Sequence, residues 1–219
     1  MRDLVIYGAG GHSRDVLEAV GAINSVISAW RCIGIVVDPE FPTPPKVHDL
    51  PVMVGADALR AYDELDVVVA VGDPAGRQRI VDRLGSLPNI QFPSVVHPKA
   101  WIGNRVVLGI GTIVLAGVVI TTDVELGAHT HVNVLSSVSH DTRIGSFCTL
   151  GPGVNIAGRV KIGDRVQIGT GASIIPCVEI GDDCVIGAGA AVIHSIPAAV
   201  TAVGVPARVR GQRDPTLQT

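Results

Sequence analysis

The stretch that decides the fold is IGDRVQIGTGASIIPCVEIGDDCVIG, residues 162–187. It repeats every six residues: each hexad opens with isoleucine, glycine usually follows, and a small or β-branched residue stands four places after the isoleucine. A period of six fits neither an α-helix, which repeats about every 3.6 residues, nor a strand, whose side chains alternate every two. Such a fixed period is typical of a repeat architecture in which short segments stack on one another.

The same six-residue register runs from Ile102 to Val192 without a slip. Its sixteen leading positions are all Ile, Leu or Val, at residues 102, 108, 114, 120, 126, 132, 138, 144, 150, 156, 162, 168, 174, 180, 186 and 192. The fourth residue after each is Val, Thr, Ser, Cys, Ala or Ile. We therefore predict a parallel β-helix, in which the aliphatic residue stacks inward, the small residue fits a narrow corner and glycine supports the turn.

The first part of the chain follows a different pattern. Apolar runs at 4–8, 32–38 and 66–73 alternate with helical spacing at 12–23, 57–62 and 76–86, while the Pro-rich stretch 39–51 is expected to be irregular. This β-α-β-α order predicts a small parallel sheet with helices on its faces. The expected domains are therefore 1–93 (α/β), 94–200 (all-β helix) and a tail at 201–219.

Composition narrows the class of protein. Hydrophobic residues make up 47% but aromatic residues only 3%, so the core must be built from aliphatic side chains. A net charge of −3 gives no general attraction to nucleic acid or anionic lipid. No apolar run is long enough to span a bilayer, and MRDLVIYGAGG lacks the features of a signal peptide, so we expect a soluble cytoplasmic protein. The cysteines form no Cys-x-x-Cys pair and are expected to be small buried residues rather than metal or disulfide ligands.

One hexad carries a pair of titratable side chains, in SSVSHDTRIG, residues 136–145. Val138 and Thr142 take the inward positions, so His140 is expected on a wall or a corner of the coil. The neighbouring Asp141 is able to orient the imidazole and stabilise its charge. A solvated surface histidine is the alternative interpretation.

The hexads resemble those of the hexapeptide-repeat acyltransferases, whose coil is a left-handed triangular β-helix of three hexads per turn. Nearly the whole chain is similar to one group of them: the sialic acid O-acetyltransferases and bacillosamine-type nucleotide-amino-sugar N-acetyltransferases. Members join a small Rossmann-like domain to the β-helix. The matching motifs are YGAGGHSRDV (7–16), VVAVGDPAGR (68–77), VHPKAWIG (96–103), VNVLSSVSHDTRIG (132–145) and VGVPAR (203–208).

The resemblance implies roles for residues of the β-helix. His140 would be the general base, with Asp141 holding its tautomer, and Asn133 would lie near the acceptor sugar. The amide of Gly158 would contact the acetyl group of acetyl-CoA. The remaining coenzyme A contacts that it implies are Ala188 and Arg208. Thr149 stands where many members carry a second histidine.

A second set of implied contacts surrounds GAGGHS, residues 8–13. A glycine-rich turn between strand and helix cradles phosphates, but Ser13 replaces the third glycine of a dinucleotide fingerprint, so the NAD signal is weak. The resemblance implies that the turn binds the diphosphate and sugar of a nucleotide sugar and that acids at strand ends line the same crevice. The residues concerned are Gly10, Gly11, His12, Asp38, Gly72 and Asp73. Pro39 departs from the basic residue that many members carry after this acid.

We therefore expect an acetyl-CoA-dependent N-acetyltransferase that acts on a nucleotide-linked amino sugar. The resemblance implies a homotrimer with active sites between protomers, one chain's glycine-rich turn facing a neighbour's His140. O-acetylation of sialic acid or another sugar hydroxyl is the first alternative; a non-catalytic sugar-nucleotide-binding scaffold and an NAD-dependent oxidoreductase are the others. His129 and His131 lie two residues apart, but no third ligand at matched spacing accompanies them, so no metal is expected.

Overall fold

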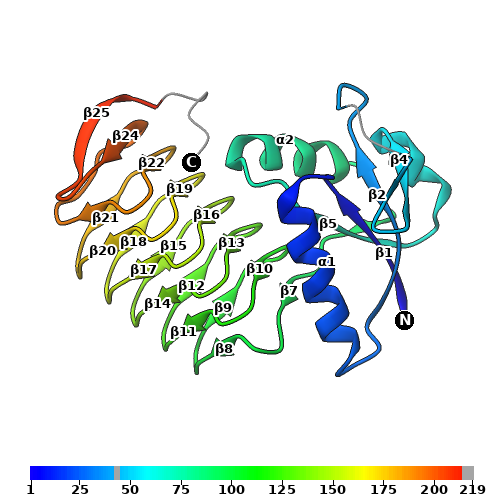
Figure 1. The fold of residues 1–219 in the computed structure, drawn as a ribbon, viewed down its shortest axis with the longest axis horizontal. Coiled ribbons are helices and arrows are strands. Elements are labelled where there is room, and N and C mark those ends of the chain that lie inside the picture. The colour runs from blue at the N-terminus through cyan, green and yellow to red at the C-terminus, as the bar shows by residue number, and fades with distance from the viewer. Residues whose placement is uncertain (42–44, 214–219) are drawn as a thin grey trace. The chain divides into compact units, whose positions relative to one another are not determined.

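The computed structural model describes residues 1–41 and 45–213, and the chain divides into two compact units, Met1–Pro98 and Lys99–Thr219 (Figure 1). Part of the tail expected at 201–219, residues 214–219, lies outside the described residues. Among those that are described, no helix is long and apolar enough to cross a membrane.

The first unit is built on a six-stranded sheet with the order β3-β4-β2-β1-β5-β6. All neighbouring pairs are parallel except β3 with β4. The strands are β1 (Arg2–Tyr7), β2 (Trp30–Val37), β3 (Lys46–Val47), β4 (Leu50–Val54), β5 (Leu65–Val69) and β6 (Ile90–Gln91). The helices are α1 (Gly11–Asn24), the 3-10 helix η1 (Ala56–Ala61) and α2 (Pro74–Leu84), and a short strand β7 (Val95–Val96) ends the unit.

Amphipathic spacing explains the first helix. Val16, Val20 and Ile23 are buried, as their helical spacing predicts, because one apolar stripe of α1 packs on the interior. The expected α/β pattern is confirmed, with two differences. The stretch 39–51 is not irregular throughout, since β3 and β4 form a hairpin whose two turn residues, His48 and Asp49, have φ of 49° and 63°. A tight two-residue turn needs such left-handed backbone, and proline at 45 and 51 does not prevent it. The expected helix at 57–62 is a 3-10 helix instead.

The chain adds strands first on one side of β1, starting with β2, and then on the other side, starting with β5. At the end of β1, Gly8 has φ of 114°, and a Cβ there would lie 2.9 Å from the carbonyl oxygen of Ala70. Only glycine is able to make this turn without strain. The carboxyl ends of β1 and β5 and the chain entering α1 and α2 therefore meet at one edge of the sheet, which is where ligands bind in open α/β sheets.

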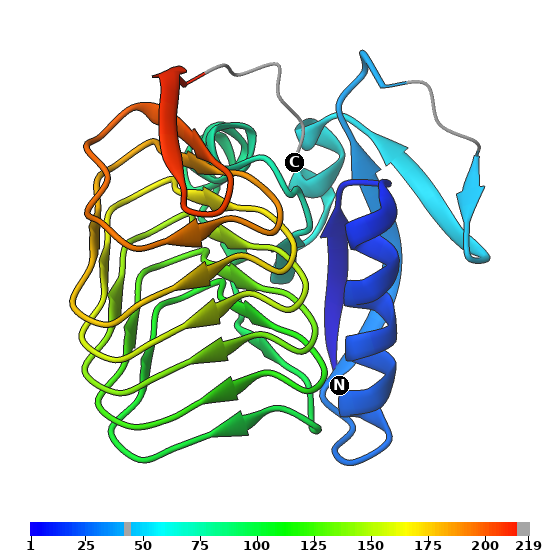
Figure 2. The same cartoon turned by 60° about the vertical axis from the view of Figure 1, so that its left-hand side comes forward.

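The second unit is a solenoid of sixteen two-residue strands, β8 to β23, stacked in coils (Figure 2). Every one of them ends on a predicted leading residue of a hexad, so the register read from the sequence is confirmed. The strands are β8 (Trp101–Ile102), β9 (Val107–Leu108), β10 (Ile113–Val114), β11 (Val119–Ile120), β12 (Glu125–Leu126), β13 (His131–Val132), β14 (Ser137–Val138), β15 (Arg143–Ile144), β16 (Thr149–Leu150), β17 (Asn155–Ile156), β18 (Lys161–Ile162), β19 (Gln167–Ile168), β20 (Ser173–Ile174), β21 (Glu179–Ile180), β22 (Val185–Ile186) and β23 (Ala191–Val192).

Three parallel sheets form the walls of the solenoid, and each strand pairs with the one 18 residues further on. Wall I holds β8, β11, β14, β17, β20 and β23; wall II holds β9, β12, β15, β18 and β21. Wall III holds β10, β13, β16, β19 and β22, followed by β24 (Val200–Val203) and the antiparallel β25 (Arg208–Gln212). We name the turns between them the I/II, II/III and III/I corners, in chain order.

The interior of the solenoid is as the hexads predict. From Val114 onward every leading residue is at most 4% exposed, so the stacked aliphatic column is dry. Two buried hydroxyls in the corners donate to carbonyls of the next coil. Thr130 donates to Gly145 at 2.7 Å, and Thr142 donates to Ala157 at 3.1 Å. These bonds tie adjacent coils together and hold the corner backbone in place.

Candidate active site

His140 and Asp141 lie in the I/II corner, in the turn between β14 and β15. Asp141 has φ of 59°, a left-handed conformation that aspartate tolerates better than most residues. Its Oδ2 lies 2.7 Å from Nδ1 of His140. A carboxylate at this distance favours the tautomer with hydrogen on Nδ1, which leaves the lone pair of Nε2 available to accept a proton. Both side chains are about half exposed, at 50% and 55%, so Nε2 is within reach of a substrate.

Gly158 occupies the same corner one coil further along, between β17 and β18. A Cβ at this position would lie 2.6 Å from Cε1 and 2.7 Å from Nε2 of His140. The glycine is therefore required by the imidazole that covers it. The backbone N–H of Arg159 donates to the carbonyl of His140 at 2.9 Å and fixes the spacing of the two coils. The predicted pair of base and glycine amide is thus brought together by the fold.

Charged side chains surround this corner in a way that sequence reasoning missed. A surface groove of about 480 Å³ begins at the corner and runs over wall II. Its lining is almost entirely charged: Arg105, Val107, Asp123, Glu125, Asp141, Arg143, Arg159 and Lys161. Four of these residues are spaced 18 apart, at 105, 123, 141 and 159. Comparing residues three hexads apart in the sequence would have found them.

Three other predicted residues of the solenoid lie elsewhere. Asn133 and Ala188 are in the III/I corner, after β13 and β22, and Arg208 is an exposed residue of β25. The side-chain amide of Asn133 donates to the carbonyl of Leu150 at 2.7 Å. A single solenoid therefore does not bring these residues to His140.

The glycine-rich turn of the first unit is open. Gly10 caps α1 without a side chain, and a Cβ built on Gly10 or Gly11 meets no atom within 4 Å. Ser13 turns inward and donates to the carbonyl of Gly10 at 2.6 Å. The first N–H groups of a helix of 14 residues carry partial positive charge, so this turn offers donors and space to an anionic group.

A buried arginine supports the neighbouring loop. The guanidinium of Arg77 is fully buried and donates through Nη1 to the carbonyls of Val71 at 2.5 Å and Gly72 at 3.2 Å. Burial and the Arg77 cation lower the pKa of His12 to about 4. The His12 imidazole is therefore neutral at neutral pH and acts as a hydrogen-bonding group rather than a cation.

The two predicted carboxylates of this unit both have structural partners. Asp73 caps α2 by accepting from the N–H of Gly76 at 2.6 Å. Oδ1 of Asp38 accepts from the Tyr7 hydroxyl at 2.5 Å and from Arg83 at 2.6 Å. Burial and this bond to Asp38 raise the pKa of Tyr7. The contacts of Asp38 and Asp73 with a nucleotide stay predictions.

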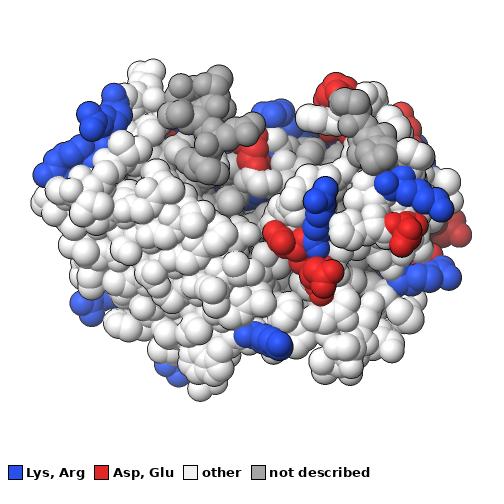
Figure 3. Space-filling model, in the orientation of Figure 1, with Lys and Arg blue, Asp and Glu red and all other residues white. Residues whose placement is uncertain are grey.

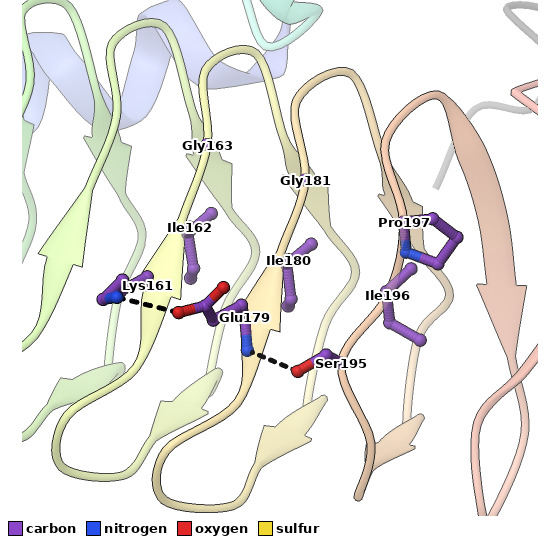
Figure 4. Close-up of a pocket in the computed structure, with 9 residues that line it drawn as sticks. All are labelled: Lys161, Ile162, Gly163, Glu179, Ile180, Gly181, Ser195, Ile196 and Pro197. Atoms are coloured by element: carbon purple, nitrogen blue, oxygen red, sulfur yellow. Dashed lines mark hydrogen bonds and ion pairs between the residues drawn. The ribbon is translucent and has the colours of Figure 1, made fainter.

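The remaining candidates are accounted for by packing. The ring of His129 stacks on Phe147 with centroids 5.2 Å apart. In the described parts of the chain, no three His, Cys, Asp or Glu side chains are grouped to hold a metal ion. Cys148 and Cys184 are buried and Cys32 is half-buried, but Cys177 is exposed, contrary to expectation, because it occupies an outward corner position. A second cavity of about 580 Å³ lies on wall II between the Lys161–Glu179 ion pair and Ser195 and contains no predicted site residue (Figure 4).

Comparison with known proteins places these features in a family. Two family models match the chain: the PglD N-terminal domain over residues 3–84, and the bacterial transferase hexapeptide (six repeats) over residues 141–174 and 159–194. The chain superimposes with a TM-score of 0.89 and 34% identity on a histidine-to-asparagine mutant of perosamine N-acetyltransferase from Caulobacter crescentus in complex with CoA and GDP-perosamine. That match covers 97% of this chain and 98% of the other. The chain belongs to the hexapeptide-repeat nucleotide-amino-sugar acetyltransferases.

Two curated members of the family are also similar. GDP-perosamine N-acetyltransferase from Escherichia coli O157:H7 is 32% identical over 152 residues, which are 68% of this chain and 66% of that protein. UDP-N-acetylbacillosamine N-acetyltransferase from Bacillus subtilis (strain 168) is 34% identical over 126 residues, or 53% of this chain and 52% of that protein. The chain thus aligns with just under two thirds and about half of these two relatives. Membership confirms the predicted fold, a left-handed β-helix joined to a Rossmann-like domain, and an acetyl-CoA-dependent acetyltransferase class.

Proposed function

We propose that this protein transfers the acetyl group of acetyl-CoA to the amine of a nucleotide-linked amino sugar, a GDP-linked one in the first instance. The observation that carries the proposal is the His140–Asp141 pair packed on Gly158 in the solenoid corner. Proteins with GDP-perosamine in their names match this chain over its greater part, which favours guanine over uracil. The histidine substituted in the Caulobacter structure is consistent with a central role for a histidine in this family.

In the proposed reaction the sugar amine attacks the thioester carbonyl while Nε2 of His140 removes a proton from the amine. Asp141 stabilises the imidazolium that forms. The N–H of Gly158 is the proposed donor to the oxyanion of the tetrahedral intermediate. The intermediate then collapses, the carbon–sulfur bond breaks, and the coenzyme A thiolate takes the proton back from His140.

The nucleotide end of the acceptor is assigned to the first unit. The open turn at Gly10 and Gly11 supplies N–H donors for the diphosphate, and the neutral imidazole of His12 supplies a hydrogen bond to the sugar or its phosphate. Gly72, held by Arg77, lines the same sheet edge. We assign the ribose and base to Asp38 and Asp73, whose bonds to Tyr7, Arg83 and Gly76 then orient them for the ligand.

A homotrimer with active sites between protomers is part of the proposal. Asn133 and Ala188 lie at a different corner from His140, so a site that uses all three residues needs a second protomer. The outward residues of wall I are uncharged throughout: Trp101, Val119, Ser137, Asn155, Ser173 and Ala191. Figure 3 shows that few charged side chains break the surface of the solenoid in that view. Such a surface suits contact between subunits, and coenzyme A, with Arg208 near its phosphates, is placed in the same interface.

The test is release of thiol from acetyl-CoA with a panel of acceptors: GDP-, UDP- and dTDP-linked 4-amino sugars, and free sialic acid. Mass spectrometry of the product locates the acetyl group. Turnover on an amino sugar, with the acetyl group on nitrogen, is the expected result. Turnover on sialic acid alone would replace it with O-acetylation. No thiol release with any acceptor, together with no binding of coenzyme A, would leave a sugar-nucleotide-binding scaffold. We also propose that the enzyme acts in the cytoplasm.

A further inference from the structure

The I/II corner carries a column of charges that runs past the catalytic pair. Arg105, Asp123, Asp141 and Arg159 occupy the same position of four successive coils, and all four have left-handed backbone, with φ between 57° and 60°. Neighbouring coils pair as parallel strands, so successive members of the column are about 4.8 Å apart at the backbone. The order of charge along the column is positive, negative, negative, positive.

The first two members of the column, Arg105 and Asp123, form an ion pair. Arg105 meets both carboxylate oxygens of Asp123, at 2.5 Å from Nε and 2.8 Å from Nη2, and Thr122 donates to the same carboxylate at 2.9 Å. These bonds, that of Arg105 first, lower the pKa of Asp123 to about 2. Asp123 is therefore a carboxylate at neutral pH, and Arg105 offsets the negative charge that it presents to the next coil.

The last member of the column, Arg159, has a different kind of partner. Arg159 donates through Nε to the thiol of Cys177 at 3.3 Å, not to a carboxylate. The other cations of the groove have acidic partners: Arg143 lies 3.4 Å from Glu125, and Lys161 lies 2.8 Å from Glu179. Within residues 1–41 and 45–213 no ion pair is formed by Arg159. The pKa of Arg159 is raised by the bond to Cys177 and further by the carboxylate of Asp141, so the charge of this guanidinium acts on the carboxylate that binds His140.

We propose that Arg105 and Arg159 are positioning residues that set the pH at which His140 acts as the base. Asp141 binds the imidazole, Asp123 lies one coil before it, and the two arginines carry the opposite charge on either side of these carboxylates. The other charges that face the corner are Glu125, Arg143 and Lys161 on wall II, and β14 and β17 add only Ser137 and Asn155, which are uncharged. This inference rests on the proposed function, since it needs His140 to be the base.

The test is the pH dependence of kcat/KM for thiol release, measured for the wild type and for Arg159→Gln, Arg105→Gln and Asp123→Asn. Removing either arginine takes away a positive charge near the imidazole, so the acid limb of the profile should move to higher pH. The expected shift is roughly half a pH unit to one pH unit for a single charge in a solvated site. Asp123→Asn should move it to lower pH. Because the corner is exposed, the shifts should shrink as salt is raised to about 1 M.

Two controls separate charge from structure. Arg159→Lys keeps the cation and should keep the wild-type profile. Arg165→Gln removes an arginine from the equivalent position of the II/III corner, where it binds Asp183 at 2.8 and 2.9 Å, and should leave the limb in place even if it lowers the melting temperature. Superimposable profiles for the wild type, Arg159→Gln and Arg105→Gln, with activity still dependent on His140, would overturn this inference alone. Equal activity of the wild type and His140→Ala would overturn the proposed function as well.

Discussion

The imidazole of His140 rests on the α-carbon of Gly158, at a distance that leaves no room for a methyl group. The two residues are 18 apart in the sequence, which is one full coil of the solenoid. The solenoid therefore brings both halves of the proposed acyl-transfer site to one corner: an imidazole oriented by Asp141, and a backbone amide beside it. In the proposed assembly, the acceptor sugar is held by other parts of the chain or by a second protomer.

Gly158→Ala should displace the imidazole and leave the fold intact. Gly158 does not have positive φ, so alanine causes no backbone strain, and the three atoms nearest to its Cβ all belong to the ring of His140. We expect kcat to fall by about a hundredfold, the scale of a lost general base, with little change in melting temperature. Gly211→Ala, where a Cβ meets no atom within 4 Å, is the matched control. A Gly158→Ala enzyme with near wild-type kcat would contradict this packing.

Asp141→Asn keeps the shape of the side chain and removes its charge. Asparagine also tolerates the left-handed backbone at this position, so folding should be unaffected. The amide stabilises an imidazolium poorly and allows the wrong tautomer, and kcat should fall by about ten- to a hundredfold with KM for acetyl-CoA unchanged. Asp183→Asn, at the equivalent position of another corner, should reduce stability and not kcat. An Asp141→Asn enzyme as active as the wild type would show that the acid does not orient the base.

Gly11→Ala tests the nucleotide site. Position 11 is the first residue of α1 and has open space around it, so alanine should preserve or raise the melting temperature. If the turn cradles a diphosphate, the added methyl group occupies that space and KM for the nucleotide sugar should rise by about tenfold, which is about 1.4 kcal/mol. Gly21→Ala, later in the same helix and also unobstructed, should leave KM unchanged. An unaltered KM in Gly11→Ala would place the diphosphate elsewhere.

Acid should weaken the solenoid through Asp123. Its folded pKa of about 2 lies below the ordinary value of 3.8. Its stabilising effect is therefore fully present above pH 3.8 and is lost as the pH falls toward 2. Melting temperatures measured by circular dichroism should be higher for the wild type than for Asp123→Asn above pH 4, and the two curves should converge near pH 2. Curves that stay parallel over this range would mean that the Arg105–Asp123 pair contributes nothing to stability.

The solenoid was predictable in detail because every residue from Ile102 to Val192 has a fixed position in the six-residue repeat. The leading aliphatic positions mark the end of each strand, and the residue four places later, buried from Thr112 onward, marks each corner. The same register placed His140 away from the interior, since Val138 and Thr142 fill the inward positions. The first unit was predictable only in outline. Hairpin β3–β4 depends on two non-glycine residues in left-handed backbone, which leave no signal that pattern reasoning recognises.

Contacts between neighbouring coils could not be predicted when the hexads were considered one at a time. Arg105, Asp123 and Arg159 carry no motif, and their relation to Asp141 appears only when the sequence is read every 18 residues. The partners of Asp38 were missed for a similar reason, because Tyr7 and Arg83 are 31 and 45 residues away. Conversely, the family resemblance joined Asn133, Ala188 and Gly158 to one site, while the structure distributes them over two corners.

The most direct test of the central claim is the turnover of His140→Ala with acetyl-CoA and the best GDP-linked 4-amino sugar, measured beside its affinity for coenzyme A by calorimetry. The account predicts that kcat falls by at least about a hundredfold, while the dissociation constant for coenzyme A stays within about twofold, because the imidazole transfers the proton and does not hold the cofactor. A variant that keeps a third or more of the wild-type kcat would show that His140 is not the base.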